Sequence, residues 1–263
     1  MPAINSDTLD ILHQMAIEGG RIAMRYHGRL DGITLKEDDS PLTAADIAVD
    51  EFLHDELSRT FPDTPIVTEE RSASQAVQAS GRFFLVDPID GTKEFVASRG
   101  EFTVNIGLIE NGVPVAGAVC APAVGRAFSG AAGIGAFESA MDGTKRRALV
   151  LAKPDNAALV AVASRSHLTP ETDEFIRANH IGRLTNAGSS LKFCLLAGGE
   201  ADIYPRFGPT MEWDTAAGDA VLRAAGGKVE KMSGDSLDYG KPGYRNPFFV
   251  AYTPGTLFNR QTS

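Results

Sequence analysis

Two stretches near the start of the chain carry apolar residues at helical spacing. Residues 6–26 place Leu9, Leu12 and Ala16 near one face, and Ser6 is a suitable N-cap residue. Residues 43–61 repeat the pattern, with apolar side chains at positions i, i+3, i+4 and i+8. The sequence therefore predicts two amphipathic helices in this region.

Shorter apolar runs follow, and they have the length and composition of strands. The predicted strands are residues 66–68, 83–86, 102–110 and 113–120. Asn111-Gly112 between the last two is a strong hairpin signal. The polar stretch 71–81 is predicted to be a mobile loop. The first half should therefore combine helices with an antiparallel sheet.

The second half alternates between strand and helix patterns. Strands are predicted at 158–163, 183–186, 201–204 and 228–231, and helices at 170–179, 189–197 and 214–225. This alternation favours a parallel or mixed sheet with helices on its faces. We expect an α/β protein whose first half is α+β. The boundary is placed near residues 130–150, dividing the chain into domains 1–140 and 141–263.

The overall charge narrows the classes of partner. The chain has 263 residues and a formal net charge of −9. Such an acidic surface argues against general binding of nucleic-acid polymers or anionic membranes. No apolar stretch approaches the roughly 20 residues of a membrane span, and no secretory signal is visible. Cys120 and Cys194 lie in apolar surroundings and are predicted to be buried thiols. We expect a cytoplasmic protein in a reducing compartment.

The most informative pattern follows the predicted strand 83–86. Residues 87–92 read Asp-Pro-Ile-Asp-Gly-Thr, so two carboxylates, Asp87 and Asp90, leave the core where the strand breaks into a turn. Carboxylates this close repel one another unless a cation neutralises them. Gly91 and Thr92 then offer backbone N–H groups to an anion. The pattern indicates metal-assisted phosphate chemistry.

Other acids also stand at the ends of predicted elements. Glu69 follows a strand, and Asp214 opens a helix. Oxygen ligands without His or Cys suit Mg²⁺ or Mn²⁺ better than zinc. The five scattered His also disfavour zinc, and the absence of a D-x-D-x-D-G loop disfavours calcium.

Taken one at a time, these motifs have ordinary explanations. Asp87 fits turn chemistry, and Asp214 fits a helix N-cap. Glu69 and Glu70 fit a solvated charge pair, and Thr43 with Asp46 fits a capping box. Only the combination favours a site.

The combination resembles a known family. Residues 67–70 (Val-Thr-Glu-Glu), 87–92, 213–218 (Trp-Asp-Thr-Ala-Ala-Gly) and 40–46 (Ser-Pro-Leu-Thr-Ala-Ala-Asp) are similar to motifs of the inositol monophosphatase superfamily. Its members are Mg²⁺-dependent, lithium-sensitive phosphatases. The resemblance implies a layered αβαβα sandwich of the inositol monophosphatase/sugar phosphatase type, and Mn²⁺ as a substitute ion.

The resemblance also implies roles for individual residues. One ion would be held by Glu69, Asp87, Asp90 and the carbonyl of Ile89, a second by Asp87, Asp90 and Asp214, and a third, weaker ion near Glu69. Thr92, hydrogen-bonded to Asp46, would orient the attacking water, and Glu69 would assist. Gly91 and Thr92 would bind the phosphate through backbone N–H groups, and Lys36 would lie near the metals.

Motifs in the second half indicate a branch of that superfamily. Residues 188–192, 204–210, 164–167 and 246–247 resemble the CysQ branch, the 3'(2'),5'-bisphosphate nucleotidases. The implied substrate is adenosine 3',5'-bisphosphate, hydrolysed to AMP and phosphate. Lys192, Arg206 or both would bind the 5'-phosphate, because cationic side chains suit phosphate oxygens. Solvated positions for Lys192 and Arg206 are the alternative.

The same resemblance adds further substrate contacts. Ser189 and Asp214 would also contact the substrate, and His167 would contact the base or ribose unless it is a plain loop residue.

Two other functions stay open from the sequence. The runner-up is an inositol-1-phosphate or fructose-1,6-bisphosphate phosphatase on the same scaffold. A non-catalytic sensor that binds Mg²⁺ and nucleotide is an alternative of another class. The partner is expected to be a small phosphorylated nucleotide, and the chain a monomer or homodimer. Peripheral association with the cytoplasmic face of the inner membrane is implied by resemblance alone.

Overall fold

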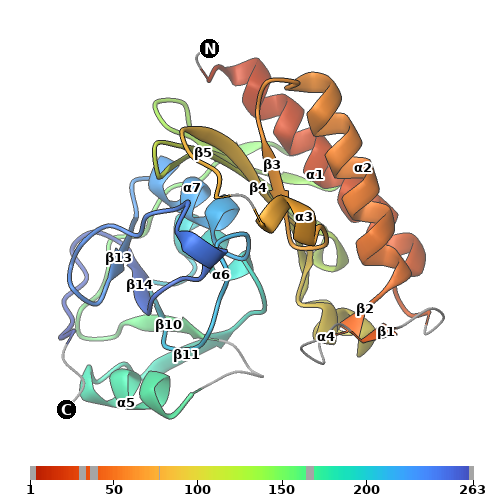
Figure 1. Cartoon of the computed structure of the whole chain (residues 1–263). Coiled ribbons are helices and arrows are strands. Elements are labelled where there is room, and N and C mark those ends of the chain that lie inside the picture. The colour runs from red at the N-terminus through yellow and green to blue at the C-terminus, as the bar shows by residue number, and fades with distance from the viewer. Residues whose placement is uncertain (1–3, 30–33, 36–40, 77, 164–168, 261–263) are drawn as a thin grey trace.

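Two long helices lie side by side along one edge of the molecule in the computed structural model, which describes residues 4–29, 34–35, 41–76, 78–163 and 169–260 (Figure 1). They are α1 (Ser6–Tyr26) and α2 (Ala44–Thr60). The N-cap of α1 is Asn5 rather than Ser6, because the Asn5 side chain accepts a hydrogen bond from the Thr8 backbone N–H at 2.8 Å. The predicted capping box at the start of α2 is confirmed.

These helices cover one face of a seven-stranded sheet with the order β3-β4-β5-β6-β7-β8-β9. The strands are β3 (Ile66–Thr68), β4 (Arg82–Asp90), β5 (Thr103–Glu110), β6 (Val113–Ala121), β7 (Arg126–Ala131), β8 (Gly135–Ala140) and β9 (Arg147–Ala148). β3 and β4 are parallel, and the other neighbours are antiparallel. The predicted hairpin is confirmed: Asn111 and Gly112 both have positive φ, as a tight two-residue turn requires.

A second, five-stranded sheet has the order β11-β10-β12-β14-β13. Its strands are β10 (Val160–Ala163), β11 (Arg183–Asn186), β12 (Ile203–Arg206), β13 (Lys228–Lys231) and β14 (Phe249–Tyr252). Parallel pairs join β10 to β11 and β12, whereas β14 runs antiparallel to both of its neighbours. The predicted mixed sheet is therefore confirmed, although β14 was not among the predicted strands.

Side chains that alternate along the strands define the layers. In β4, Phe84 and Val86 pack with α1 and α2, whereas Phe83 and Leu85 pack on the opposite face. That face and one face of the second sheet enclose α6 (Leu191–Ala197) and α7 (Ala216–Ala224). The outer face of the second sheet packs on α5 (Pro170–Ala178). The expected αβαβα sandwich is confirmed (Figure 1).

A row of three glycines brings α7 unusually close to the first sheet. Gly107, Gly117 and Gly130 are paired across β5, β6 and β7. A Cβ added at Gly117 would lie 2.4 Å from the backbone oxygen of Ala217, inside van der Waals contact. The row therefore fixes the height of α7 above the sheet, and with it the start of that helix.

Several predicted boundaries needed correction. β4 continues to Asp90 instead of ending before Asp87, since its pairing with β5 resumes there after an irregularity. The stretch predicted as a mobile loop contains the short helix α3 (Ser72–Gln75). β7, β8 and β9 were not predicted, and they extend the first sheet to Ala148. The division into domains 1–140 and 141–263 stays a prediction.

Three smaller observations complete the fold. A two-stranded pair, β1 (Thr34–Leu35) and β2 (Pro41–Leu42), precedes α2. Cys120 and Cys194 are buried free thiols, as predicted. Among the described residues, no helix combines the length and apolar character that crossing a membrane requires.

Candidate active site

Three acids that are distant in sequence meet at one point between the sheets. Single carboxylate oxygens of Glu69, Asp87 and Asp214 all lie within 4.8 Å of one another. Glu69 directly follows β3, Asp87 lies in β4, and Asp214 stands two residues before α7. The parallel pairing of β3 and β4 brings the first two together, and the packing of α7 brings the third. Three of the four acids expected to converge form this group, and the fourth, Asp90, lines the same cavity.

The end of β4 supplies the next part of the site. Pairing with β5 is irregular between Asp87 and Asp90, so the strand changes course where its acids emerge. Gly91 then adopts a left-handed conformation with φ 92°, and α4 (Thr92–Val96) begins at the next residue. A side chain at Gly91 would also approach the Ser189 hydroxyl to 2.6 Å. Glycine is thus required both by backbone conformation and by space.

Burial, assisted by repulsion between neighbouring carboxylates, disfavours the charged form of three acids at the site. Burial, followed by the charge of Glu69, raises the pKa of Asp87 well above its ordinary value. Burial and the charge of Asp90 do the same to the pKa of Asp214. Burial is also the main cause that raises the pKa of Asp90, to about 6. Asp87 Oδ1 is buried and has no hydrogen-bond partner within the described part of the chain.

This donor set fits a hard divalent cation. A buried carboxylate oxygen without a partner is costly unless a cation or a donor satisfies it. Oxygen atoms close together are the ligands that Mg²⁺ and similar ions prefer. The cluster formed by Glu69, Asp87 and Asp214 can therefore hold a metal ion.

Asp46 and Thr92 are in contact, as the sequence analysis expected. Thr92 Oγ1 lies 3.3 Å from Asp46 Oδ1 and 3.0 Å from the carbonyl oxygen of Ile89. The other oxygen of Asp46 accepts the Thr43 backbone N–H at 2.8 Å. The capping box and the functional contact are thus compatible, since each uses a different oxygen of one carboxylate.

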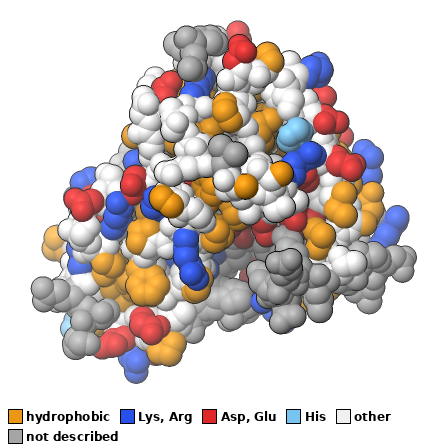
Figure 2. Space-filling model, viewed as in Figure 1, with side chains coloured by type: hydrophobic (Ala, Val, Ile, Leu, Met, Phe, Trp, Pro, Cys, Tyr) orange, Lys and Arg blue, Asp and Glu red, His pale blue; other side chains and the backbone are white. Residues whose placement is uncertain are grey.

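Among the described residues, three cationic side chains line the same cavity as the acids: Lys93, Lys192 and Arg206. A cavity of about 230 Å³ is lined by the acidic cluster and by Lys192, Tyr204 and Arg206. In the space-filling view, acidic side chains gather near the centre of the face, beside a hollow (Figure 2). Arg206 donates to the Pro209 carbonyl at 2.8 Å and is partly buried.

Lys192 is not the solvated helix residue that the alternative interpretation required. It is only 3% exposed, and its Nζ lies 5.3 Å from the centre of the Tyr204 ring. Burial lowers the pKa of Lys192 to about 8, opposed by the charge of Asp90 and assisted by that of Arg206. A buried ammonium beside an open cavity is poised to meet an anion.

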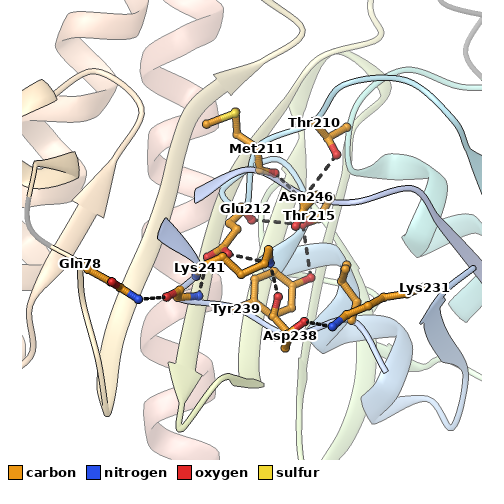
Figure 3. Close-up of polar contacts among 12 residues, drawn as sticks. Gln78, Thr210, Met211, Glu212, Thr215, Lys231, Asp238, Tyr239, Lys241 and Asn246 are labelled. Atoms are coloured by element: carbon orange, nitrogen blue, oxygen red, sulfur yellow. Dashed lines mark hydrogen bonds and ion pairs between the residues drawn. The ribbon is translucent and has the colours of Figure 1, made fainter. Parts of the chain in front are cut away.

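The loop that carries Asp214 is held by a polar network (Figure 3). Asn246 Nδ2 donates to the Met211 carbonyl at 2.8 Å and to Thr215 Oγ1 at 3.0 Å. Buried Glu212 accepts the Lys241 backbone N–H at 2.9 Å and pairs with the Lys241 ammonium at 2.7 Å. The Met211 backbone N–H in turn donates to Asp214 Oδ2 at 2.9 Å. The hydrogen bond to Asp214 thus starts from an anchored loop.

Some residues that support the site escaped the sequence analysis. Buried Asp50 of α2 accepts hydrogen bonds from Thr68 Oγ1 and, at 2.7 Å, from Arg71 Nε. Gln75 of α3 donates to the Thr68 and Glu69 carbonyls. The polar side chains of Asp50 and Gln75 were the available signal, but which groups they reach depends on tertiary packing. Lys36 and His167 lie outside the described residues.

Ser189 and Ser190 also hold the acids. The Ser189 hydroxyl, predicted to contact the substrate, donates to the carbonyls of Asp90 and Glu101. The Ser190 backbone N–H donates to Asp90 Oδ2 at 2.8 Å. Asp214 itself does not cap α7, whose N-cap residue is Thr215.

Residues 5–248, which include the layered fold and the acidic cavity, match the family model described as the inositol monophosphatase family. The chain belongs to the inositol monophosphatase family. The resemblance found in the sequence is confirmed.

Curated relatives and solved structures agree with this assignment. The 3'(2'),5'-bisphosphate nucleotidase CysQ of Escherichia coli (strain K12) is 43% identical over 249 residues, which are 92% of this chain and 98% of that protein. The crystal structure of CysQ from Bacteroides thetaiotaomicron matches with a TM-score of 0.80 and 36% identity, covering 94% of this chain and 97% of that one. An IMPase from Thermotoga maritima matches with a TM-score of 0.77 and 26% identity over 94% and 92%. The similarity to the CysQ branch is thus confirmed.

Proposed function

We propose that this chain is a Mg²⁺-dependent phosphomonoesterase that hydrolyses the 3'-phosphate of adenosine 3',5'-bisphosphate, releasing AMP and phosphate. One observation carries the proposal: a single cavity combines an acidic cluster with a buried lysine and an arginine. Metal ions bound by the acids would suit the phosphate that reacts. The cationic side chains of the lysine and the arginine would suit a second phosphate. The relatives named 3'(2'),5'-bisphosphate nucleotidase support this choice of substrate.

The acids would hold two or three divalent ions, with Mn²⁺ as a substitute and Li⁺ as an inhibitor. The ligands would be Glu69, Asp87, Asp90, Asp214 and the Ile89 carbonyl. Ions bound there supply a nucleophilic water and neutralise the developing charge on the phosphate. When the single hydroxyl hydrogen of Thr92 is directed to Asp46, the Ile89 carbonyl, 3.0 Å from Thr92 Oγ1, keeps its lone pairs for an ion.

The remaining residues would position the water and the substrate. Thr92 donates its hydroxyl hydrogen to Asp46, so its oxygen is free to accept a hydrogen bond from the attacking water. Glu69 would assist in removing the proton of that water. The backbone N–H groups of Gly91 and Thr92 would bind oxygens of the 3'-phosphate, and Ser189 would line that subsite.

Lys192 and Arg206 would bind the 5'-phosphate. A charge-assisted hydrogen bond to a buried cation contributes about 1.5–3 kcal/mol. We therefore expect discrimination in favour of a substrate with two phosphates. The enzyme would recycle a nucleotide by-product. A cytoplasmic location is consistent with the two free cysteines, because thiols stay reduced in that compartment.

The proposal is tested by phosphate release from three substrates in Mg²⁺: adenosine 3',5'-bisphosphate, inositol-1-phosphate and fructose-1,6-bisphosphate. We expect kcat/KM for the nucleotide to exceed that for inositol-1-phosphate at least about tenfold, because inositol-1-phosphate lacks the second phosphate and loses one such hydrogen bond. Fructose-1,6-bisphosphate also carries two phosphates, so it tests whether the cavity selects the nucleotide rather than any bisphosphate. The reverse preference would overturn the proposed substrate. Tight binding of the nucleotide without any phosphate release would favour the sensor.

A variant separates the two phosphates. Lys192→Met keeps the length of a buried side chain and removes its charge, so kcat/KM for the bisphosphate should fall roughly 10- to 100-fold. Hydrolysis of 3'-AMP, which lacks a 5'-phosphate, is the matched control and should change less than about threefold. Equal losses on both substrates would contradict the assignment of Lys192.

A further inference from the structure

Ser190 contacts both sides of the acidic site at once. Its backbone N–H donates to Asp90 Oδ2 at 2.8 Å, and its hydroxyl donates to the Asp214 backbone carbonyl at 2.6 Å. Ser190 is fully buried. One residue thus joins an acid at the end of β4 to an acid that precedes α7, 100 and 24 positions away in the chain.

The position of Ser190 makes this use of its hydroxyl informative. It is the N-cap residue of α6, where a serine side chain ordinarily accepts a hydrogen bond from the helix backbone. Here no side-chain capping bond is formed. The hydroxyl instead satisfies the carbonyl of Asp214, so helix capping does not explain the serine.

The segment around Ser190 is held rigidly. Gly188 packs so tightly that an added Cβ would lie 2.3 Å from the Glu101 carbonyl oxygen. Ser189 has a left-handed backbone with φ 54°, and its hydroxyl donates at 2.7 Å to the Asp90 carbonyl. A strained conformation persists only where its surroundings fix it. The segment can therefore transmit a fixed spacing to the two acids.

We infer that Ser190 is a positioning residue for the metal site, setting the separation of Asp90 and Asp214 at the spacing that divalent ions require. The inference rests on the proposed function, because it assumes that these acids are metal ligands. The same segment leads into α6 and its Lys192, so it also ties the acids to the cation in the cavity. Substitutions of groups that orient metal ligands typically cost 10- to 100-fold in affinity or activity.

The test is Mg²⁺ binding by Ser190→Ala, measured by calorimetry on the metal-free protein without substrate. We expect the Mg²⁺ dissociation constant to rise roughly tenfold. The Mg²⁺ concentration that gives half-maximal kcat should rise in parallel, while KM for the bisphosphate at saturating Mg²⁺ changes less than about threefold.

Ser139→Ala is the matched control. Ser139 is also a buried serine, and its hydroxyl bonds His13 Nε2 at 2.8 Å and the Ala140 carbonyl at 2.9 Å in β8. In chelator, Ser139→Ala should lose about as much thermal stability as Ser190→Ala does. It should nevertheless keep the wild-type affinity for Mg²⁺. An unchanged Mg²⁺ affinity in Ser190→Ala would overturn the inference, whatever its stability.

Failure of the inference is distinguishable from failure of the proposed function. If wild-type protein binds Mg²⁺ but releases no phosphate, the proposed function is wrong. The Mg²⁺ affinity of Ser190→Ala still tests the positioning role of Ser190 in that case. Wild-type protein that binds no Mg²⁺ would overturn both.

Discussion

At the scale of single residues, the site buries several carboxyl groups together, and burial of their charged forms costs free energy of folding. Asp87, Asp90 and Asp214 are packed together in low-dielectric surroundings, and the pKa of each is raised. Without a cation, each ionised carboxylate destabilises the folded chain. We therefore infer that the acids lower the stability of the metal-free protein because their role is to bind cations.

Removing one of these charges should therefore stabilise the metal-free protein. Asp90→Asn keeps an oxygen that can accept the Ser190 N–H but carries no charge. In chelator at pH 7.5, its melting temperature should exceed that of wild type by about 2–4 °C. Hydrolysis should fall at least about 100-fold, since Asp90 is one of the proposed metal ligands.

The effect of pH on this stabilisation has a definite sign. The pKa of Asp90 is about 6 in the folded chain and about 3.9 in an unfolded one. The cost of its charge is thus fully present above pH 6 and disappears as the pH falls from 6 towards about 4. The melting temperatures of wild type and Asp90→Asn, measured by calorimetry, should therefore converge as the pH falls through this range. A stability difference independent of pH would contradict the electrostatic cause.

At the scale of elements, one helix-to-sheet contact decides where Asp214 lies. Gly107, Gly117 and Gly130 allow α7 to pack on the backbone of β5, β6 and β7. Small residues on the helix, such as Ala217, complete that contact. The distance between α7 and the sheet therefore determines how closely Asp214 approaches Asp87.

A methyl group in this contact should disturb both stability and catalysis. Gly117→Ala must push α7 away, because its Cβ would meet the Ala217 backbone. We expect a loss of about 1–3 kcal/mol in the free energy of unfolding and of roughly 10- to 100-fold in kcat/KM. Denaturant unfolding and phosphate release measure the two effects.

Gly182→Ala is the control for that substitution. Gly182 has open space at its Cβ and no positive φ, so the change should stay within about 0.5 kcal/mol. If Gly117→Ala kept full activity despite its lower stability, the link between the height of α7 and the site would fail.

At the scale of the whole molecule, the layer formed by α6 and α7 is shared. One continuous core joins it to the inner faces of both sheets, including Leu85 of the first and Tyr204 of the second. Arg126 of β7 also forms an ion pair at 2.5 Å with Glu200, which follows α6. Neither sheet can expose its inner face without disrupting this layer.

The molecule should therefore unfold as one unit. Trp213, the single tryptophan, is 5% exposed in this shared core, beside Asp214. Its fluorescence and the far-UV circular dichroism should report the same melting temperature, in chelator and in Mg²⁺. Two separate transitions would contradict a shared core. In that case the fluorescence of Trp213 would change at a temperature at which half of the circular dichroism signal still remained.

The sequence alone was sufficient for the local order of the chain. Helix α1, the hairpin at Asn111-Gly112 and the alternation of the second half follow from periodicity and turn chemistry, which are properties of neighbouring residues. The ordered acidic motifs were likewise enough to identify the family and to nominate Glu69, Asp87, Asp90 and Asp214. Strands β7, β8 and β9 escaped, because their small residues and glycines give weak signals.

Only the tertiary structure decided which groups meet. Whether Lys192 is solvated or buried, and whether the Ser190 hydroxyl caps a helix or binds Asp214, depends on which segments the fold places against them. The same holds for the glycine row, whose pairing across three strands is not visible along the chain. Sequence patterns specify residue types and local conformation, whereas distances between remote residues are fixed by packing, and catalysis depends on those distances.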